Sequence, residues 1–208
     1  MLTIGTLLPI MNPFSTMPLF LSLTAQMDSA KRNREARMAC VYALALLVGF
    51  LVLGEAMIDF FGISVPGIRV AGGLIISVIG LRMLFSAPVA ARSASAQESE
   101  LEGEIAFTPL AMPSLAGPGS LSVVITAASQ IKSKNPSDYE LIYLGVIAGM
   151  IIVVVIAFVV LRAASSMARF LGPSGIDAMT RIFGFLLIAI GMQFLLTGIS
   201  DFYGLAHA

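Results

Sequence analysis

The chain alternates between long apolar runs and shorter polar connections, and the lengths of the apolar runs predict its elements. A helix that crosses a hydrocarbon core of about 30 Å needs roughly 20 residues, and more when it is tilted. Six segments have this length and composition: Thr3–Thr24, Ala39–Phe60, Ser64–Phe85, Ile105–Ser129, Leu141–Leu161 and Arg181–Ser200. The pattern therefore predicts an all-α integral membrane protein with six transmembrane helices.

One connection is long and plainly polar, and it divides the six predicted helices into two groups of three. Its sequence, PVAARSASAQESELEGE, is rich in Ala, Ser and Glu. We interpret residues 1–87 as a first three-helix repeat, residues 88–104 as a flexible polar linker and residues 105–208 as a second repeat. All three parts belong to one membrane domain.

The two predicted halves share sequence features. RVAGGLIISVIG begins at Arg69 in the first half, and RIFGFLLIAIG begins at Arg181 in the second. The opening helix of each half also carries a proline-centred interruption, NPFS from Asn12 and GPGS from Gly117. Because each half has an odd number of helices, the second half enters the membrane from the opposite side. The repeats are therefore expected to be inverted.

The paired interruptions form the first candidate site. A proline inside a helix removes an amide donor and clashes with the preceding turn. Backbone groups freed in this way are tolerated at membrane depth only where they line protein or a water-filled cavity. Paired, Pro/Gly-interrupted helices in inverted repeats are typical of secondary transporters, whereas a kink that only improves packing is the alternative. We expect a substrate site formed by Asn12, Pro13, Ser15, Thr16, Gly117, Pro118, Gly119 and Ser120.

Composition and charge support the membrane location and indicate an orientation. The chain is 58% hydrophobic and 12% charged, whereas soluble proteins contain about 25% charged residues. Lys and Arg balance Asp and Glu at 12 each, which indicates no nucleic-acid partner. Positive residues concentrate in or beside the odd-numbered loops: Lys31, Arg32, Arg34, Arg37, Arg82, Arg92, Arg162 and Arg169. By the positive-inside rule these loops are cytoplasmic and both termini are periplasmic.

Three charged residues within or beside the predicted helices are candidates for coupling or gating. Arg69 and Arg181 stand near the starts of the third and sixth helices, where an arginine either reaches the interface or has a buried role. In the buried role each could pair with Glu55, Asp177 or a substrate carboxylate. Glu55 interrupts the second helix near its outer end; it is a proton-coupling candidate, although an interfacial position is the favoured interpretation.

Several other chemistries lack the residues they need. His207 is the only histidine and Cys40 the only cysteine, so no cluster of zinc ligands is present. A Ser-His hydrolase has no base within the membrane segments, and a Ser-Lys pair would require a loop lysine. A Walker-type GK[ST] loop does not occur in the sequence. We therefore expect neither catalysis nor a metal or other cofactor.

The segments that carry the two interruptions also resemble a known family. PIMNPFSTMPLFLSLT (Pro9–Thr24), TPLAMPSLAGPGSLS (Thr108–Ser122) and TRIFGFLLIAIGMQFLLTGI (Thr180–Ile199) are similar to the MarC family of bacterial inner-membrane proteins. The similarity covers nearly the whole chain. It implies a six-helix, multi-pass inner-membrane protein, distantly similar to LysE-type amino-acid exporters and grouped with small neutral amino-acid transporters. The motif positions carry over as Asn12, Pro13, Gly117, Pro118 and Gly119, without an agreed ion-binding set.

Three functional hypotheses follow. The leading one is secondary transport, by import or export, of a small zwitterionic solute such as a neutral amino acid, with its carboxylate facing helix N-termini. The second is a small-solute channel, although the sequence supplies no charged ring. The third is a structural or regulatory protein that transports nothing. The lipid bilayer is the partner that the composition requires, while coupling to H+ or Na+ and assembly into a homo-oligomer stay open.

Overall fold

The computed structural model is helical, without strands, across the residues that it describes, which are 2–24, 26–85, 106–134 and 139–205. The helices are α1 (Leu2–Met11), α2 (Pro13–Leu23), α3 (Ser29–Phe61), α4 (Val65–Phe85), the π-helix η2 (Ala106–Leu115), α6 (Pro118–Lys134), α7 (Tyr139–Arg162) and α8 (Ala164–Tyr203). The expected all-α fold is confirmed. The predicted linker at residues 88–104 lies outside the described residues.

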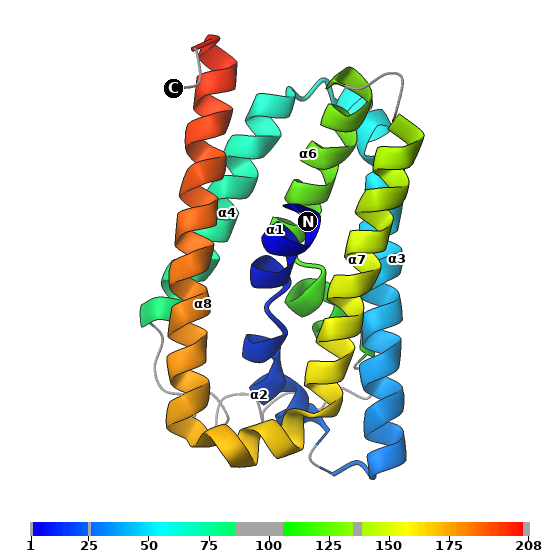
Figure 1. Cartoon of the computed structure of the whole chain (residues 1–208), viewed down its shortest axis with the longest axis vertical. Coiled ribbons are helices and arrows are strands. Elements are labelled where there is room, and N and C mark those ends of the chain that lie inside the picture. Colours follow the sequence, from blue (N-terminus) through cyan, green and yellow to red (C-terminus); the bar gives the residue numbers. More distant parts are fainter. Residues whose placement is uncertain (1, 25, 86–105, 135–138, 206–208) are drawn as a thin grey trace.

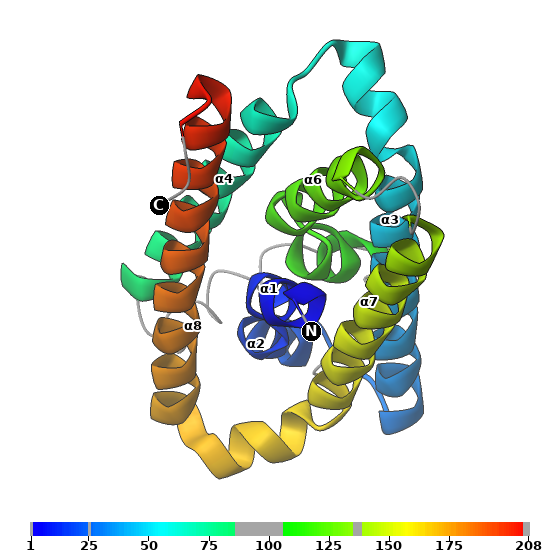
Figure 2. The same cartoon turned by 45° about the horizontal axis from the view of Figure 1, so that its top comes forward.

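Four continuous helices surround the interrupted ones. Within the described residues, helical stretches long and apolar enough to cross a membrane lie in α3, α4 and α7 and in the part of α8 from Ser174 to Tyr203. The other two predicted spans are each divided, one into α1 and α2 and the other into η2 and α6. Figure 1 shows α4 beside α8 and α3 beside α7, and Figure 2 shows these helices around α1, α2 and α6. The interrupted helices therefore lie inside a frame of continuous ones, whereas six membrane passes stay a prediction.

The second predicted helix begins earlier in the structure than its apolar run does. α3 starts at Ser29 rather than near Ala39. The side chain of Asp28 caps this end, because its carboxylate accepts a hydrogen bond from the backbone N–H of Lys31 at 2.8 Å. The positively charged first loop is therefore largely helical, and a boundary drawn from hydropathy excludes it.

The last helix also extends beyond its predicted start. α8 begins at Ala164 rather than near Arg181 and runs to Tyr203. It bends at Gly172, where φ is 64° and ψ is 176°. A residue with a side chain seldom adopts this conformation, whereas glycine does so at little cost. The bend turns the first part of α8 across the end of the bundle, which Figure 1 shows at the bottom.

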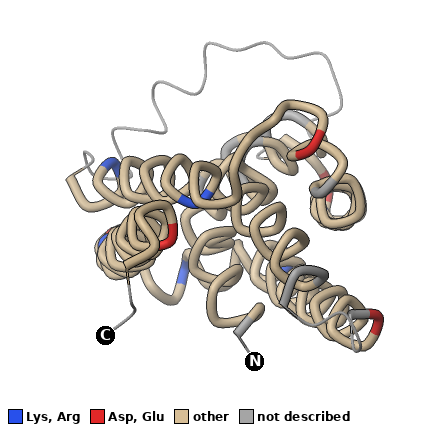
Figure 3. Tube along the Cα trace, turned by 90° about the horizontal axis from the view of Figure 1, so that it is seen from above, with Lys and Arg blue, Asp and Glu red and all other residues tan. Residues whose placement is uncertain are grey.

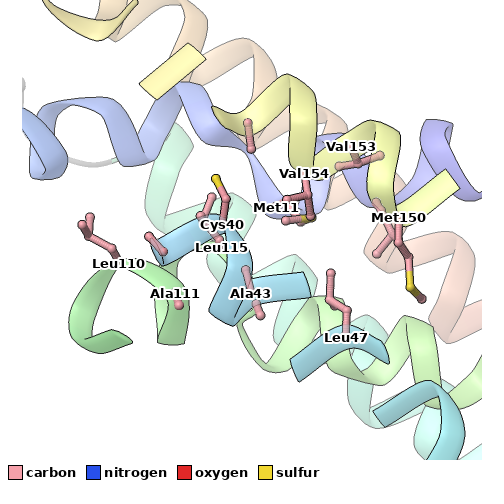
Figure 4. Close-up of a cluster of buried hydrophobic side chains, with 14 of the residues drawn as sticks. Met11, Cys40, Ala43, Leu47, Leu110, Ala111, Leu115, Met150, Val153 and Val154 are labelled. Carbon is pink, nitrogen blue, oxygen red and sulfur yellow. The ribbon is translucent and has the colours of Figure 1, made fainter. Parts of the chain in front are cut away.

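A hydrophobic core joins the interrupted helices to the frame. Met11 of α1, Leu47 of α3, Leu115 of η2 and Met150 of α7 are each 1% exposed or less. Figure 4 shows side chains from these four elements gathered around the end of α1. Between helices in a bilayer such contacts stabilise mainly through van der Waals packing. The fit of these side chains therefore holds the first helix break in place.

Glycines bring α4 and α8 into backbone contact along an antiparallel seam. A Cβ added at Gly73 would lie 2.6 Å from the carbonyl oxygen of Gly191, and one added at Gly80 would lie 2.7 Å from that of Gly184. On each helix the two glycines are seven residues apart, so they share one face. Small residues at such positions allow two helix backbones to approach closely.

Replacing Gly191 with Ala is expected to destabilise the fold. The new Cβ would lie 2.7 Å from the carbonyl oxygen of Gly73, so the two helices would have to separate. Overpacking of this kind costs about 1–3 kcal/mol, which would lower the thermal unfolding temperature of the purified protein in detergent. Gly145→Ala is the matched control, because its Cβ would meet nothing within 4 Å and alanine favours the helix by about 1 kcal/mol. Equal losses in both variants would contradict the seam.

Candidate functional site

Asn12 forms the first break, between α1 and α2. Its φ of 34° lies in the left-handed region, which Asn tolerates better than most residues, and the proline that follows disfavours a helical conformation there. Its side-chain Oδ1 accepts a hydrogen bond from the N–H of Ser15 at 3.3 Å. The hydroxyls of Ser15 and Thr16 donate to the Asn12 carbonyl oxygen at 3.1 and 3.4 Å. Asn12 therefore caps α2, and neighbouring hydroxyls satisfy the opened backbone.

The second break lies between η2, which ends at Leu115, and α6, which starts at Pro118. The N–H of Ala116 donates to the carbonyl oxygen of Ala111 at 2.7 Å, which is the i→i−5 bond of a π-helix. The hydroxyl of Ser120 donates to the carbonyl oxygen of Leu115 at 3.3 Å. A serine in the following helix thus satisfies a carbonyl at this break, as Ser15 does at the first.

Both breaks border one cavity of about 440 Å³, which we name the inner cavity. This volume is within the range of about 300–1,000 Å³ typical of ligand pockets. Pro13 is buried beside the cavity and is not part of its lining. The other seven residues of the predicted site line it: Asn12, Ser15, Thr16, Gly117, Pro118, Gly119 and Ser120. The structure brings these residues together, while their binding of a solute stays a prediction.

The remaining wall of the inner cavity comes mainly from α4 and α8. Ile79, Arg82 and Met83 of α4 and Leu187 of α8 line it. The Nδ2 of Asn12 donates to the sulfur of Met83 at 3.7 Å. In the sequence, Arg82 stands out only as a positive residue beside a loop. Its i, i+3 relation to Ile79 places both on one helix face, but no sequence pattern shows that this face meets the breaks.

The inner cavity favours an anionic group. The first turns of α2 and α6 border it, and a helix N-terminus carries a partial positive charge. Arg82 adds a full positive charge. Among the lining residues, all of which the structure describes, there is no Asp, Glu, His or Cys. The arrangement suits a carboxylate that carries an apolar side chain, and it offers no general base.

Of the three residues proposed for coupling or gating, the two whose side chains the structure describes, Arg69 and Arg181, do not line the inner cavity. Arg69 is buried and forms an ion pair with Asp201 of α8. Asp201 was not predicted as a partner, because it follows the last predicted membrane segment. Arg181 is exposed on α8, as expected of an arginine that extends toward the interface. The side chain of Glu55 lies outside the described residues.

Comparisons with known proteins match the chain to integral membrane proteins. The model of a family described as "MarC family integral membrane protein" matches residues 1–203. The chain is 42% identical to the inner membrane protein MarC of Escherichia coli (strain K12), covering 97% of this chain and 94% of the relative. The same values hold for the inner membrane protein MarC of Shigella flexneri. No solved structure matches the chain.

Replacing Asn12 with Leu is expected to destabilise the fold through the first break. The N-cap is lost, at about 0.5–2 kcal/mol, and Leu is strained at a φ of 34°, where a non-glycine residue loses about 1–2 kcal/mol. The unfolding temperature of the purified variant should fall accordingly. Asn12→Gly is the matched control, because glycine accepts this φ and is nearly as good an N-cap. If both variants lose equally, neither the cap nor the backbone conformation stabilises the break.

Proposed function

The chain belongs to the MarC family of integral membrane proteins, and on this premise we propose that it is a secondary transporter of small neutral amino acids or similar zwitterionic solutes. Its relatives are named inner membrane proteins, which supports a location in the bacterial inner membrane. The observation that carries the proposal is the single cavity that both helix breaks border.

Interrupted helices suit solute binding because they present backbone dipoles inside the protein without a full charge. In secondary transporters, the N-termini of such half-helices point at the carboxylate of the substrate. Here the carboxylate of the solute would lie near the first turns of α2 and α6 and near Arg82. The side chain of the solute would lie against Ile79, Met83 and Leu187, which line the same cavity.

Packing between the helices supports the inverted repeat on which this comparison depends. α3 packs against η2 and α6, and α7 packs in the same way against α1 and α2. The seam of α4 and α8 fits the same symmetry. Gly73 opposes Gly191 and Gly80 opposes Gly184, so glycine still faces glycine when α4 and α8 exchange places. Gly73 then corresponds to Gly184 and Gly80 to Gly191. This register differs by one residue from the alignment that the two R-x-x-G motifs suggest.

The positions of positive residues support an orientation with both termini in the periplasm. The connections from α2 to α3 and from α7 to α8 lie at the same end of the bundle, at the bottom of Figure 1. Figure 3 shows that most of the described trace is uncharged. The residues at or near these two connections include Lys31, Arg32, Arg34, Arg37, Arg162 and Arg169. By the positive-inside rule, this end faces the cytoplasm.

Transport is tested directly with the purified chain in proteoliposomes. We expect saturable uptake of radiolabelled L-leucine or L-alanine that exceeds uptake of the D-enantiomer, measured with and without imposed H+ and Na+ gradients. Uptake that rises linearly with concentration and is equal for both enantiomers would favour a channel. Absence of uptake for every neutral amino acid tested would contradict the proposal.

In the same assay, Arg82→Gln should raise the solute concentration for half-maximal uptake. Loss of a hydrogen bond to a charged group costs about 1.5–3 kcal/mol, which corresponds to a rise of roughly tenfold or more. Arg181→Gln is the matched control, because Arg181 is exposed like Arg82 but lines neither this cavity nor its breaks. Equal effects of the two substitutions would remove Arg82 from the binding site, provided that both variants keep the wild-type unfolding temperature.

The proposed orientation has a separate test with reporter fusions in cells. A reporter that folds only in the cytoplasm should be inactive when it is fused after Ala208, and alkaline phosphatase at the same position should be active. A fusion after Ala96, in the predicted linker, should give the opposite result, because this loop is assigned to the cytoplasm. Cytoplasmic activity after Ala208 would reverse the topology and remove the basis for inverted repeats.

A further inference from the structure

A second cavity, which we name the outer cavity, lies further along the same helices. Its volume is about 580 Å³, and its wall includes residues of α1, α4, α6, α7 and α8. On α4 it is lined by Arg69, whereas the inner cavity is lined by Arg82. On α8 it is lined by Asp201 and the inner cavity by Leu187. The outer cavity is therefore displaced toward the end at which α6 approaches α7, the upper end in Figure 1.

Buried apolar side chains lie between the two cavities. Leu7 lines the outer cavity and Met11 lines the inner one, one helical turn further along the chain. Ile76 occupies the part of α4 between the residues that line the two cavities. All three side chains are 1% exposed or less. The cavities are thus two separate compartments on either side of an apolar layer.

The outer cavity contains opposite charges on facing helices. Arg69 of α4 and Asp201 of α8 form an ion pair, with side chains 9% and 29% exposed. A buried ion pair is weak evidence for a stabilising role, because desolvation of both groups offsets their attraction. Charged groups within membrane segments are costly and commonly mark the paths of solutes or ions. Both residues line the cavity, so a positive and a negative group border one space of solute size.

Polar and apolar groups complete the wall. The Oγ1 of Thr126 is buried and has no hydrogen-bond partner within the described part of the chain, and Thr126 lines this cavity. An unpaired buried hydroxyl costs about 1–3 kcal/mol, which a bound solute would recover by supplying the partner. Much of the remaining wall is aliphatic and includes Val123, Val124, Ile142 and Val146.

We propose that the outer cavity is a second binding site for a neutral α-amino acid with an aliphatic side chain. The carboxylate of the solute pairs with Arg69, its ammonium group pairs with Asp201, and its side chain lies against the aliphatic wall. A solute with a single charge would leave either Arg69 or Asp201 without a solute partner, so the cavity selects a zwitterion. The place of this site on a transport route rests on the proposed function, but binding itself requires no transport.

Equilibrium dialysis of radiolabelled L-leucine against the purified full chain in detergent tests the proposal. We expect two L-leucine molecules per wild-type chain and one per chain in Arg69→Gln/Asp201→Asn, which keeps the inner cavity. Removing both charges together avoids leaving one buried charge unpaired. N-acetyl-L-leucine and L-leucinamide each lack one charge, and neither should displace L-leucine from the outer site.

Thr126→Val is a second variant with a readout that a purely structural role would not change. Valine has nearly the same shape and removes the unpaired hydroxyl, so the unfolding temperature should be unchanged or higher. We expect L-leucine binding at the outer site to weaken by about 2-fold to 10-fold, the equivalent of one neutral hydrogen bond. This variant carries the test if the double variant does not fold.

The outcomes separate this inference from the proposed function. Absence of L-leucine binding, or a stoichiometry of one that survives the double substitution, would overturn the outer site. Unchanged affinities in Thr126→Val would do the same if the double variant cannot be purified. Two-site binding without uptake in proteoliposomes would support the outer site and contradict the transporter. Uptake with a single site that survives the double substitution would support the transporter and contradict the outer site.

Discussion

Backbone groups freed at a helix break cannot face lipid, and the rest of the structure depends on this constraint. An unsatisfied N–H or C=O in hydrocarbon costs several kcal/mol. Hydroxyls of Ser15 and Ser120 satisfy carbonyl oxygens at the two breaks. The continuous helices α3, α4, α7 and α8 enclose the interrupted ones (Figure 2). The opened backbone at both breaks thus borders a cavity within this frame.

The glycine seam gives this frame a wall that both cavities share. Because the contact of Gly73 with Gly191 is between backbones, the separation of α4 and α8 depends little on side-chain rotamers. The two helices together supply Arg82 and Leu187 to the inner cavity and Arg69 and Asp201 to the outer one. A movement of α4 and α8 as one unit would therefore change the shape of both cavities at once.

Features with local causes could be predicted from the sequence, and features that depend on distant contacts could not. Asn12 and Pro118 mark breaks because proline chemistry acts on the adjacent turn, and the structure interrupts both helices there. Asp201 is the partner of Arg69 although the two are 132 residues apart, and no local pattern connects them. The contribution of Arg82 to the inner cavity was missed for the same reason. The cap that starts α3 at Asp28 is local, but a boundary drawn from hydropathy overlooks it.

The two breaks are alike in position and different in conformation, and such a difference bears on the proposed function. The first break follows an α-helix and contains a left-handed Asn12. The second follows a π-helix, which ends with the bond from Ala116 to Ala111. Two inverted repeats with identical conformations would place the solute in the same environment from either side of the membrane. Secondary transporters built from inverted repeats alternate access largely by moving one repeat against the other around a fixed site. Under the proposed function, the unequal geometry of the two breaks is the asymmetry that such a movement would reverse.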